Sequence, residues 1–234
     1  MSKTRSHNSD DPRDLPLYSI AEAARYLKIA SATLRSWVVG RSYPTTDGSA
    51  RFEPLIKPPC PPDNQLSFNN LVEAHVLRAL RTKHSVSIGS VRNAIDFSER
   101  KLGIERLLIS GELQTSAGDL FVEKYGQLIN LSKSGQLAIK KILEAYLERI
   151  ERDSRKLPLR LYPFISGDIR GGSPKTIVID PRVSFGRPTI STKGISTAAL
   201  VARIDAGESI RDLSKDYHIG EDEVEAAVVY EQAA

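Results

Sequence analysis

The stretch SIAEAARYLKIASATLRSW, residues 19–37, decides the fold of the first part of the chain. It opens with Ser19 and Glu22 at the spacing of a capping box, in which the two side chains satisfy free amide groups at a helix start. Apolar residues follow at helical spacing, and Ser31 is the expected cap of a second helix carrying Leu34 and Trp37. Two short helices joined by a tight turn predict a helix-turn-helix.

The apolar positions of this stretch match the inner side of a helix-turn-helix. The inward places fall on Ala23, Leu27, Ile29, Leu34 and Trp37, and the small Ala24 stands where the two helices cross closely. Lys28 occupies a turn position that usually takes glycine, because the backbone there has positive φ.

Hydroxyls and guanidinium groups on the outward side favour DNA as the partner. Arginine can bond guanine at O6 and N7 in a bidentate way, and basic residues of a following hairpin can lie along the phosphates or in the minor groove. Arg41 and Arg51 flank residues 43–49, a stretch long enough for such a wing. The candidate DNA-binding residues are therefore Lys28, Ser31, Thr33, Arg35, Ser36, Arg41 and Arg51.

Composition places the chain among ordinary globular proteins and supports a polyanion as partner. Of 234 residues 40% are hydrophobic and 26% charged, and no apolar run is long enough to span a bilayer. Residues 1–103 carry fifteen basic against ten acidic side chains, whereas residues 175–234 carry seven against ten. The front of the chain therefore suits nucleic acid better than the back does. The polar N-terminus lacks a secretory pattern and there is a single cysteine, so we expect a cytoplasmic protein without disulfides or a multi-cysteine metal site.

Breaks in composition divide the chain into five parts. We expect a flexible arm at residues 1–16, a DNA-binding domain at 17–103, a middle α+β segment at 104–165, a linker at 166–175 and a compact module at 176–234. The predicted fold class is mostly α with small β elements.

Helices dominate the expected front region and strands the expected middle. Ser67 and Ser87 are expected caps of two more helices, the second of which ends at Gly103. Residues 106–110, 120–125 and 128–131 are β-prone runs separated by glycines, and residues 157–164 form a further candidate strand. An amphipathic helix is predicted from about Gln136 to Asp153, and its wide apolar stripe fits either a dimer interface or packing within the monomer.

The back region reads as two strands followed by three short helices. An apolar strand at residues 176–179 ends at Asp180-Pro181, and the turn Gly186-Arg187-Pro188 leads into Thr189-Ile190. Helices are expected from Thr197 to a stop at Gly207, from a cap at Ser209, and from Glu221. The last of these is rich in acidic residues, which phosphates would repel, so this pair of helices is better suited to protein contact.

The front motif resembles the winged helix-turn-helix of MerR-like regulators. The runs Ala23 to Ile29 and Thr33-Leu34-Arg35-Ser36-Trp37 carry the resemblance. It implies that the second helix enters the major groove with Thr33 and Arg35 and that Arg41 and Arg51 act in the wing. Lys28 in place of glycine, and a proline-rich wing without the usual Gly-x-Arg-x-Tyr pattern, depart from the family.

The back module resembles the domain of unknown function 433 over residues 176–232. Ile179-Asp180-Pro181, the run from Gly186 to Ile190 and the run from Ala206 to Ile210 carry this resemblance in order. A MerR-like front joined to this module is similar to VapB-type antitoxins, which accompany PIN-like ribonuclease toxins. The resemblance implies a repressor of its own operon that also neutralises a toxin.

The residues assigned to toxin contact are Phe185, Arg187 and Pro188. Arg187 on a rigid turn could meet the metal-binding carboxylates of a PIN-like nuclease, since a guanidinium pairs well with carboxylates. The alternative is that Gly186-Arg187-Pro188 is only a tight turn with a solvated arginine.

The histidines are scattered without metal-ligand spacing, and no glycine-rich phosphate loop or catalytic cluster is present in the sequence. We therefore expect no enzyme, no cofactor and no metal. The main hypothesis is a homodimer that binds two-fold related operator DNA. The alternatives are a MerR-like or excisionase-type regulator without a toxin, and a protein-interaction scaffold that no longer binds DNA.

Overall fold

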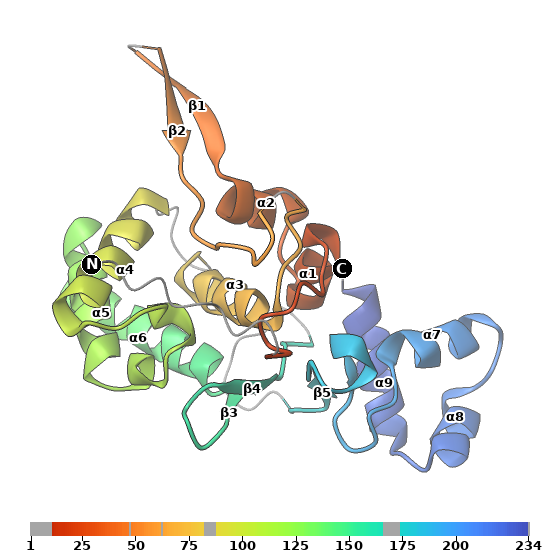
Figure 1. Ribbon diagram of the computed structural model, residues 1–234. Helices are drawn as coiled ribbons and strands as arrows, with labels where there is room; N and C mark the ends of the chain where they lie inside the picture. Colours follow the sequence, from red (N-terminus) through yellow and green to blue (C-terminus); the bar gives the residue numbers. More distant parts are fainter. Residues whose placement is uncertain (1–10, 47, 62, 82–87, 166–173, 234) are drawn as a thin grey trace.

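The computed structural model describes residues 11–46, 48–61, 63–81, 88–165 and 174–233 (Figure 1). The front elements are α1 (Ile20–Leu27), α2 (Ser31–Val39), β1 (Arg41–Thr45), β2 (Gly48–Phe52), α3 (Phe68–Arg81) and α4 (Ile88–Leu102). The middle elements are η1 (Leu107–Ile109), η2 (Gly111–Gln114), α5 (Ser116–Leu128), α6 (Lys133–Leu147), β3 (Ile150–Arg152) and β4 (Pro158–Leu161). The back elements are β5 (Ile177–Val178), η3 (Ser184–Gly186), β6 (Thr189–Ile190), α7 (Thr197–Asp205), α8 (Ile210–Tyr217) and α9 (Glu221–Gln232).

Within the described ranges, the helices and three small antiparallel strand pairs confirm the predicted mostly α fold class. The pairs are β1 with β2, β3 with β4, and β5 with β6. None of the helices in the described ranges combines the length and apolarity needed to cross a membrane.

Local sequence rules account for the front helices. The capping box of Ser19 and Glu22 is present at the start of α1, and Ser67 caps α3 by accepting the amide of Asn70 at 3.2 Å. The expected cap at Ser31 is wrong by one residue: Ala30 precedes α2, and its carbonyl accepts the first amides of the helix without a side-chain cap. Ser87 lies outside the described residues, and Gly103 follows α4 with φ +66° as expected.

The middle segment corrects the predicted strands. Residues 107–109 form a short 3₁₀ helix and residues 120–125 lie inside α5. Two glycines read as strand breaks are close-packing positions instead: a Cβ on Gly118 would lie 2.1 Å from the carbonyl oxygen of Leu113, and one on Gly126 would lie 2.5 Å from Gln136. The absence of side chains at these positions lets α5 approach η2 and α6.

Helix α6 is shorter than predicted because the chain turns into a hairpin. It ends at Leu147, and residues 150–152 pair with β4, which confirms a strand within 157–164. The buried guanidinium of Arg149 holds this turn by donating to the carbonyl oxygens of Tyr162 at 2.8 Å and Pro163 at 3.1 Å. The apolar stripe of α6 lies largely within the monomer, with Ile139, Leu143, Tyr146 and Leu147 buried, although Leu137 remains 60% exposed.

One large core joins the front and middle regions around α3. Every described side chain from Leu66 to Leu80 is buried except Arg78. The core runs from Tyr18 to Ile179, so the division expected at residue 103 crosses a shared core. Of the expected flexible arm, residues 1–10 lie outside the described residues. Arg13, within the same arm, is buried and pairs with Asp11 at 2.7 Å and Asp153 at 2.9 Å.

The back module has its own smaller core, which consists of Ile177, Ile190, Leu200, Leu213, Ile219, Val224, Ala227 and Tyr230. Its predicted strands and helices are present, with Ser209 capping α8 and Gly207 at φ +98° after α7. Most of the expected linker, residues 166–173, lies outside the described residues.

The buried histidine of α3 makes stability depend on pH. Burial lowers the pKa of His75 from 6.5 to about 3, and its Nε2 lies 3.0 Å from the carbonyl oxygen of Tyr146. Between these pKa values the unfolded chain binds a proton that the folded chain does not. We therefore expect His75 to lower the free energy of unfolding as pH drops below about 6. Its contribution should be a loss of roughly 1.4 kcal/mol for each pH unit.

Chemical denaturation of the His75→Gln variant from pH 7 to pH 4 tests this. Glutamine can still donate to the Tyr146 carbonyl but does not titrate, so the acid-dependent loss should be shallower than in the native chain. His218→Asn, at an exposed histidine, serves as control. If the free energy of unfolding falls with pH as steeply in His75→Gln as in the native chain, His75 is not the source of the acid-dependent loss.

Candidate nucleic-acid interface

Helices α1 and α2 form the helix-turn-helix that the sequence predicts. Five of the six expected inner side chains are buried and Ile29 packs partly buried against the same core. Lys28 adopts the left-handed conformation, with φ 54° and ψ 45°, so this residue takes the turn conformation usually left to glycine.

The outward side of α2 is accessible in the way that a groove-reading helix requires. Ser31 and Arg35 are exposed, and no described residue forms a hydrogen bond or an ion pair with the Arg35 guanidinium. Thr33 and Ser36 are half-buried, and the Ser36 hydroxyl donates to the Thr33 carbonyl at 2.7 Å. Arg35 is thus the most available of these side chains, and Ser36 already has a partner within its own helix.

A hairpin of β1 and β2 projects from the body at the end of α2 (Figure 1). The register pairs Arg41 with Phe52 and Ser42 with Arg51. Paired residues share a face of the ribbon, so the two candidate arginines lie on opposite faces of the wing. Tyr43, which the sequence analysis did not select, follows Arg41 on the same face and is 43% exposed; its alternation with Arg41 could have identified it.

Lys28 points toward the back module. Its ammonium donates to the carbonyl oxygen of Tyr230 and lies 4.0 Å from the centre of the Tyr230 ring. Burial, followed by the nearby charges of Arg25 and Arg78, lowers the pKa of Lys28 to about 8 against the opposing effect of Glu231. A DNA contact by Lys28 stays a prediction, and the structure gives this side chain a contact between domains.

Several polar contacts fasten the back module to α1, and α9 lies beside α1 in Figure 1. The Tyr230 hydroxyl donates to the Tyr26 carbonyl at 2.8 Å, and Arg25 pairs with Glu231 at 3.0 Å. At the other end of α1, the buried Tyr18 hydroxyl donates to the Gly186 carbonyl at 3.1 Å. The helix-turn-helix and the back module therefore meet along α1.

Gly186 allows the closest of these approaches. Its φ is +71°, and a Cβ there would lie 2.2 Å from the Tyr18 hydroxyl oxygen. We expect Gly186→Ala to lower the free energy of unfolding by about 2–4 kcal/mol, because it adds a clash between buried groups to an unfavourable backbone conformation.

The matched control is Gly194→Ala, where φ is +70° but a new Cβ would meet only Val183 Cγ1, at an ordinary 3.5 Å. That change should cost only about 1 kcal/mol. Equal losses in urea denaturation of the two variants would mean that the Tyr18 contact contributes nothing.

The loop from Asp180 to Pro188 is held by ion pairs to one buried carboxylate. Asp180 is 2% exposed and accepts bonds from Arg160 at 3.0 Å and Arg182 at 2.8 Å. Burial by itself would raise the pKa of Asp180, but the bonds from Arg182 and Arg160 outweigh it and lower the pKa below its usual value. The Ile179-Asp180-Pro181 motif therefore has a structural role.

This loop presents an aromatic side chain to the exterior. Phe185 is 84% exposed and has φ 54°, and Ser184 before it has φ 49°. Positive φ is uncommon for a bulky residue and marks strain. Arg187 is exposed as expected for a partner contact, whereas Pro188 is buried. Within the described part of the chain, no three His, Cys, Asp or Glu side chains are grouped to hold a metal.

Comparison with protein families gives one match in the front region and one in the back module. Residues 16–95 match a family described as "Putative DNA-binding HTH domain". Residues 177–230 match "Protein of unknown function (DUF433)". The two matches lie in the regions where the sequence predicts a helix-turn-helix and a module resembling the domain of unknown function 433.

A curated relative and a solved structure each match this chain along nearly its whole length. The chain is 29% identical to the "Putative antitoxin VapB45" of Mycobacterium tuberculosis, over 92% of this chain and 93% of the relative. The crystal structure of Rv2018 from Mycobacterium tuberculosis shares the fold with a TM-score of 0.65 at 24% identity, over 92% of this chain and 98% of that chain. The resemblance to VapB-type antitoxins that the sequence predicts is confirmed by these matches.

Proposed function

We propose that this chain is the antitoxin of a toxin–antitoxin pair, a DNA-binding regulator and not an enzyme. It binds operator DNA through α2 and the wing, represses its own operon, and neutralises a PIN-like ribonuclease toxin by direct contact in the cytoplasm. The similarity to a relative named as an antitoxin along nearly the whole of both chains carries the proposal.

The exposed side of α2 supports the DNA-binding part. Arg35 is accessible at the centre of this side, and Arg41 and Arg51 are exposed on the hairpin that follows. MerR-like docking would place α2 in the major groove and the wing along the backbone. A homodimer would present two such helices to a two-fold related operator, and the described structure assigns no surface to that dimer.

Substitution of Thr33 and Arg35 tests DNA binding. We expect the double variant Thr33→Ala, Arg35→Ala to bind the duplex directly upstream of its own coding sequence at least tenfold more weakly, because one good base contact is worth about 1–3 kcal/mol. Fluorescence anisotropy at fixed salt, with an unrelated duplex of equal length, provides the measurement.

Arg211→Ala is the matched control, since Arg211 is an exposed arginine of the back module. Native chain that binds both duplexes equally, with no loss in the double variant, would favour the protein-interaction scaffold over the DNA-binding regulator.

The strained loop of the back module supports toxin contact. Aromatic side chains and arginine dominate binding at protein interfaces, and an exposed phenylalanine at positive φ adds nothing to the core while it disfavours the local backbone. Phe185 and the neighbouring Arg187 are suited to an apolar pocket rimmed by acidic groups. Pro188 contributes by fixing the backbone after Arg187, since its ring is buried.

The variant Phe185→Gly separates a binding role from a structural one. Glycine relieves the positive φ, so we expect unchanged or slightly increased stability, by up to about 1 kcal/mol. Affinity for a PIN-like ribonuclease encoded by the adjacent reading frame should fall tenfold or more in isothermal titration calorimetry.

Leu137→Gln, which removes another exposed apolar side chain, is the control and should bind normally. If Phe185→Gly keeps native affinity, the loop is not the contact. Failure of the native chain to bind or inhibit that ribonuclease would favour the regulator without a toxin.

A further inference from the structure

The root of the wing is tied to the recognition helix by main-chain bonds. The amides of Leu55 and Ile56 both donate to the carbonyl of Trp37, at 2.7 and 3.0 Å. Gly40, at the end of α2, has φ +82°, and a Cβ there would lie 2.2 Å from the Phe52 carbonyl oxygen. Both ends of the hairpin therefore converge closely on the end of α2.

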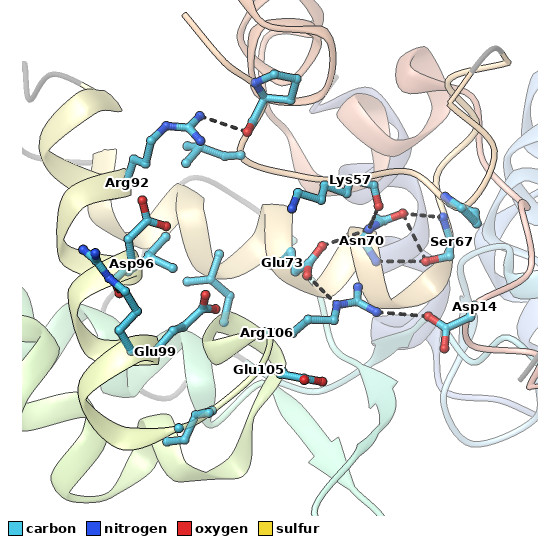
Figure 2. A pocket seen from close by; sticks show the side chains of 18 residues that line it. Asp14, Lys57, Ser67, Asn70, Glu73, Arg92, Asp96, Glu99, Glu105 and Arg106 are labelled. Carbon is cyan, nitrogen blue, oxygen red and sulfur yellow. Dashed lines mark hydrogen bonds and ion pairs between the residues drawn. The ribbon is translucent and has the colours of Figure 1, made fainter. Parts of the chain in front are cut away.

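Helix α4 provides a second support for the root of the wing, from the other side of a cavity. A cavity of about 700 Å³ lies between α3, α4 and the segment that follows the wing, with Pro54, Leu55, Lys57, Glu73, Arg92 and Glu99 among its lining residues (Figure 2). The cavity lies between α4 and this segment, so a side chain that crosses it links the two directly.

Arg92 spans this gap. Its guanidinium donates to the carbonyl oxygens of Glu53 and, at 2.9 Å, Pro54, and lies 5.9 Å from the centre of the Phe52 ring. Figure 2 shows the side chain reaching from α4 to the segment after the wing. Helix α4 is itself anchored in the core, with Val91, Ala94 and Ile95 buried. Arg92 thus joins the last residues of the wing to a fixed helix of the body.

We propose that Arg92 is a positioning residue for DNA binding: it fixes the direction of the wing without touching DNA. The proposal rests on the proposed DNA binding and adds a determinant outside the helix-turn-helix. A wing whose root is fixed loses less conformational freedom when it meets the phosphates, so affinity depends on a side chain directed toward the protein.

Arg92→Ala should weaken binding to the upstream duplex about fivefold to twentyfold, as expected for loss of hydrogen bonds from a charged donor. The slope of affinity against salt should stay as in the native chain, whereas a lost phosphate contact lowers that slope by about one. Arg100→Ala is the matched control. Arg100 lines the same cavity from α4 but, among the residues that the structure describes, donates only to the Asp96 carbonyl of its own helix.

A double-mutant cycle identifies the route of the effect. In a chain with Arg41→Ala and Arg51→Ala, the wing contributes little to binding, and Arg92→Ala should then change affinity less than twofold. An effect that persists in full, a salt slope lowered by about one, or native affinity in Arg92→Ala overturns the proposal.

Amide hydrogen exchange of the free protein tests the role of Arg92 independently of DNA binding. Amides of residues 41–57 should exchange at least fivefold faster in Arg92→Ala than in the native chain, while those of α5 should not change. If the native chain does not bind the upstream duplex, the proposed DNA binding is contradicted, whatever the exchange rates are. Unchanged exchange over residues 41–57 contradicts the role of Arg92, whatever the native affinity is.

Discussion

The burial of α3 along its length is the constraint on which the rest of the structure depends. Polar side chains on a helix buried along its length need partners within the protein, because unpaired buried polar groups are costly. Asn70 exchanges bonds with Ser67 and donates to Glu73, which in turn accepts from Arg106 at 2.9 Å, and Arg106 also reaches Asp14 (Figure 2). This chain of contacts links the N-terminal residues, α3 and the start of the middle segment.

The same helix explains why the DNA-binding part does not stand apart from the middle segment. Helix α1 packs on one side of α3, while α6 and β4 contact it elsewhere, and His75 meets Tyr146 and Phe164 in one aromatic group. The helix-turn-helix is consequently mounted on a large core. A large core beneath the helix-turn-helix keeps α2 and the wing in a fixed relative position. The proposed contact with a stiff duplex requires such a fixed arrangement.

The back module is joined to this body at two places with different chemistry. Main-chain bonds between Leu161 and Ile179, at 2.8 and 3.0 Å, extend the β3–β4 hairpin into the module. The Tyr230 hydroxyl and the ion pair of Arg25 with Glu231 hold α9 against α1. The loop with Phe185 lies directly after the first junction and its Gly186 contacts Tyr18 before α1. Strain in that loop is tolerated because the Asp180 ion pairs and the Tyr18 bond fix both of its ends.

The sequence by itself determined the features that depend on near neighbours along the chain. Capping at Ser19, Ser67 and Ser209, the helix stops at Gly103 and Gly207, and the inner positions of α1 and α2 all follow from spacing over a few residues, as does the wing between Arg41 and Arg51. Tertiary structure decided the rest. Gly118 and Gly126 appear as breaks in sequence but serve close helix packing, and the role of Arg92 depends on a segment 38 residues away. Local propensity cannot report such contacts, because their energy comes from partners that only the folded chain brings within reach.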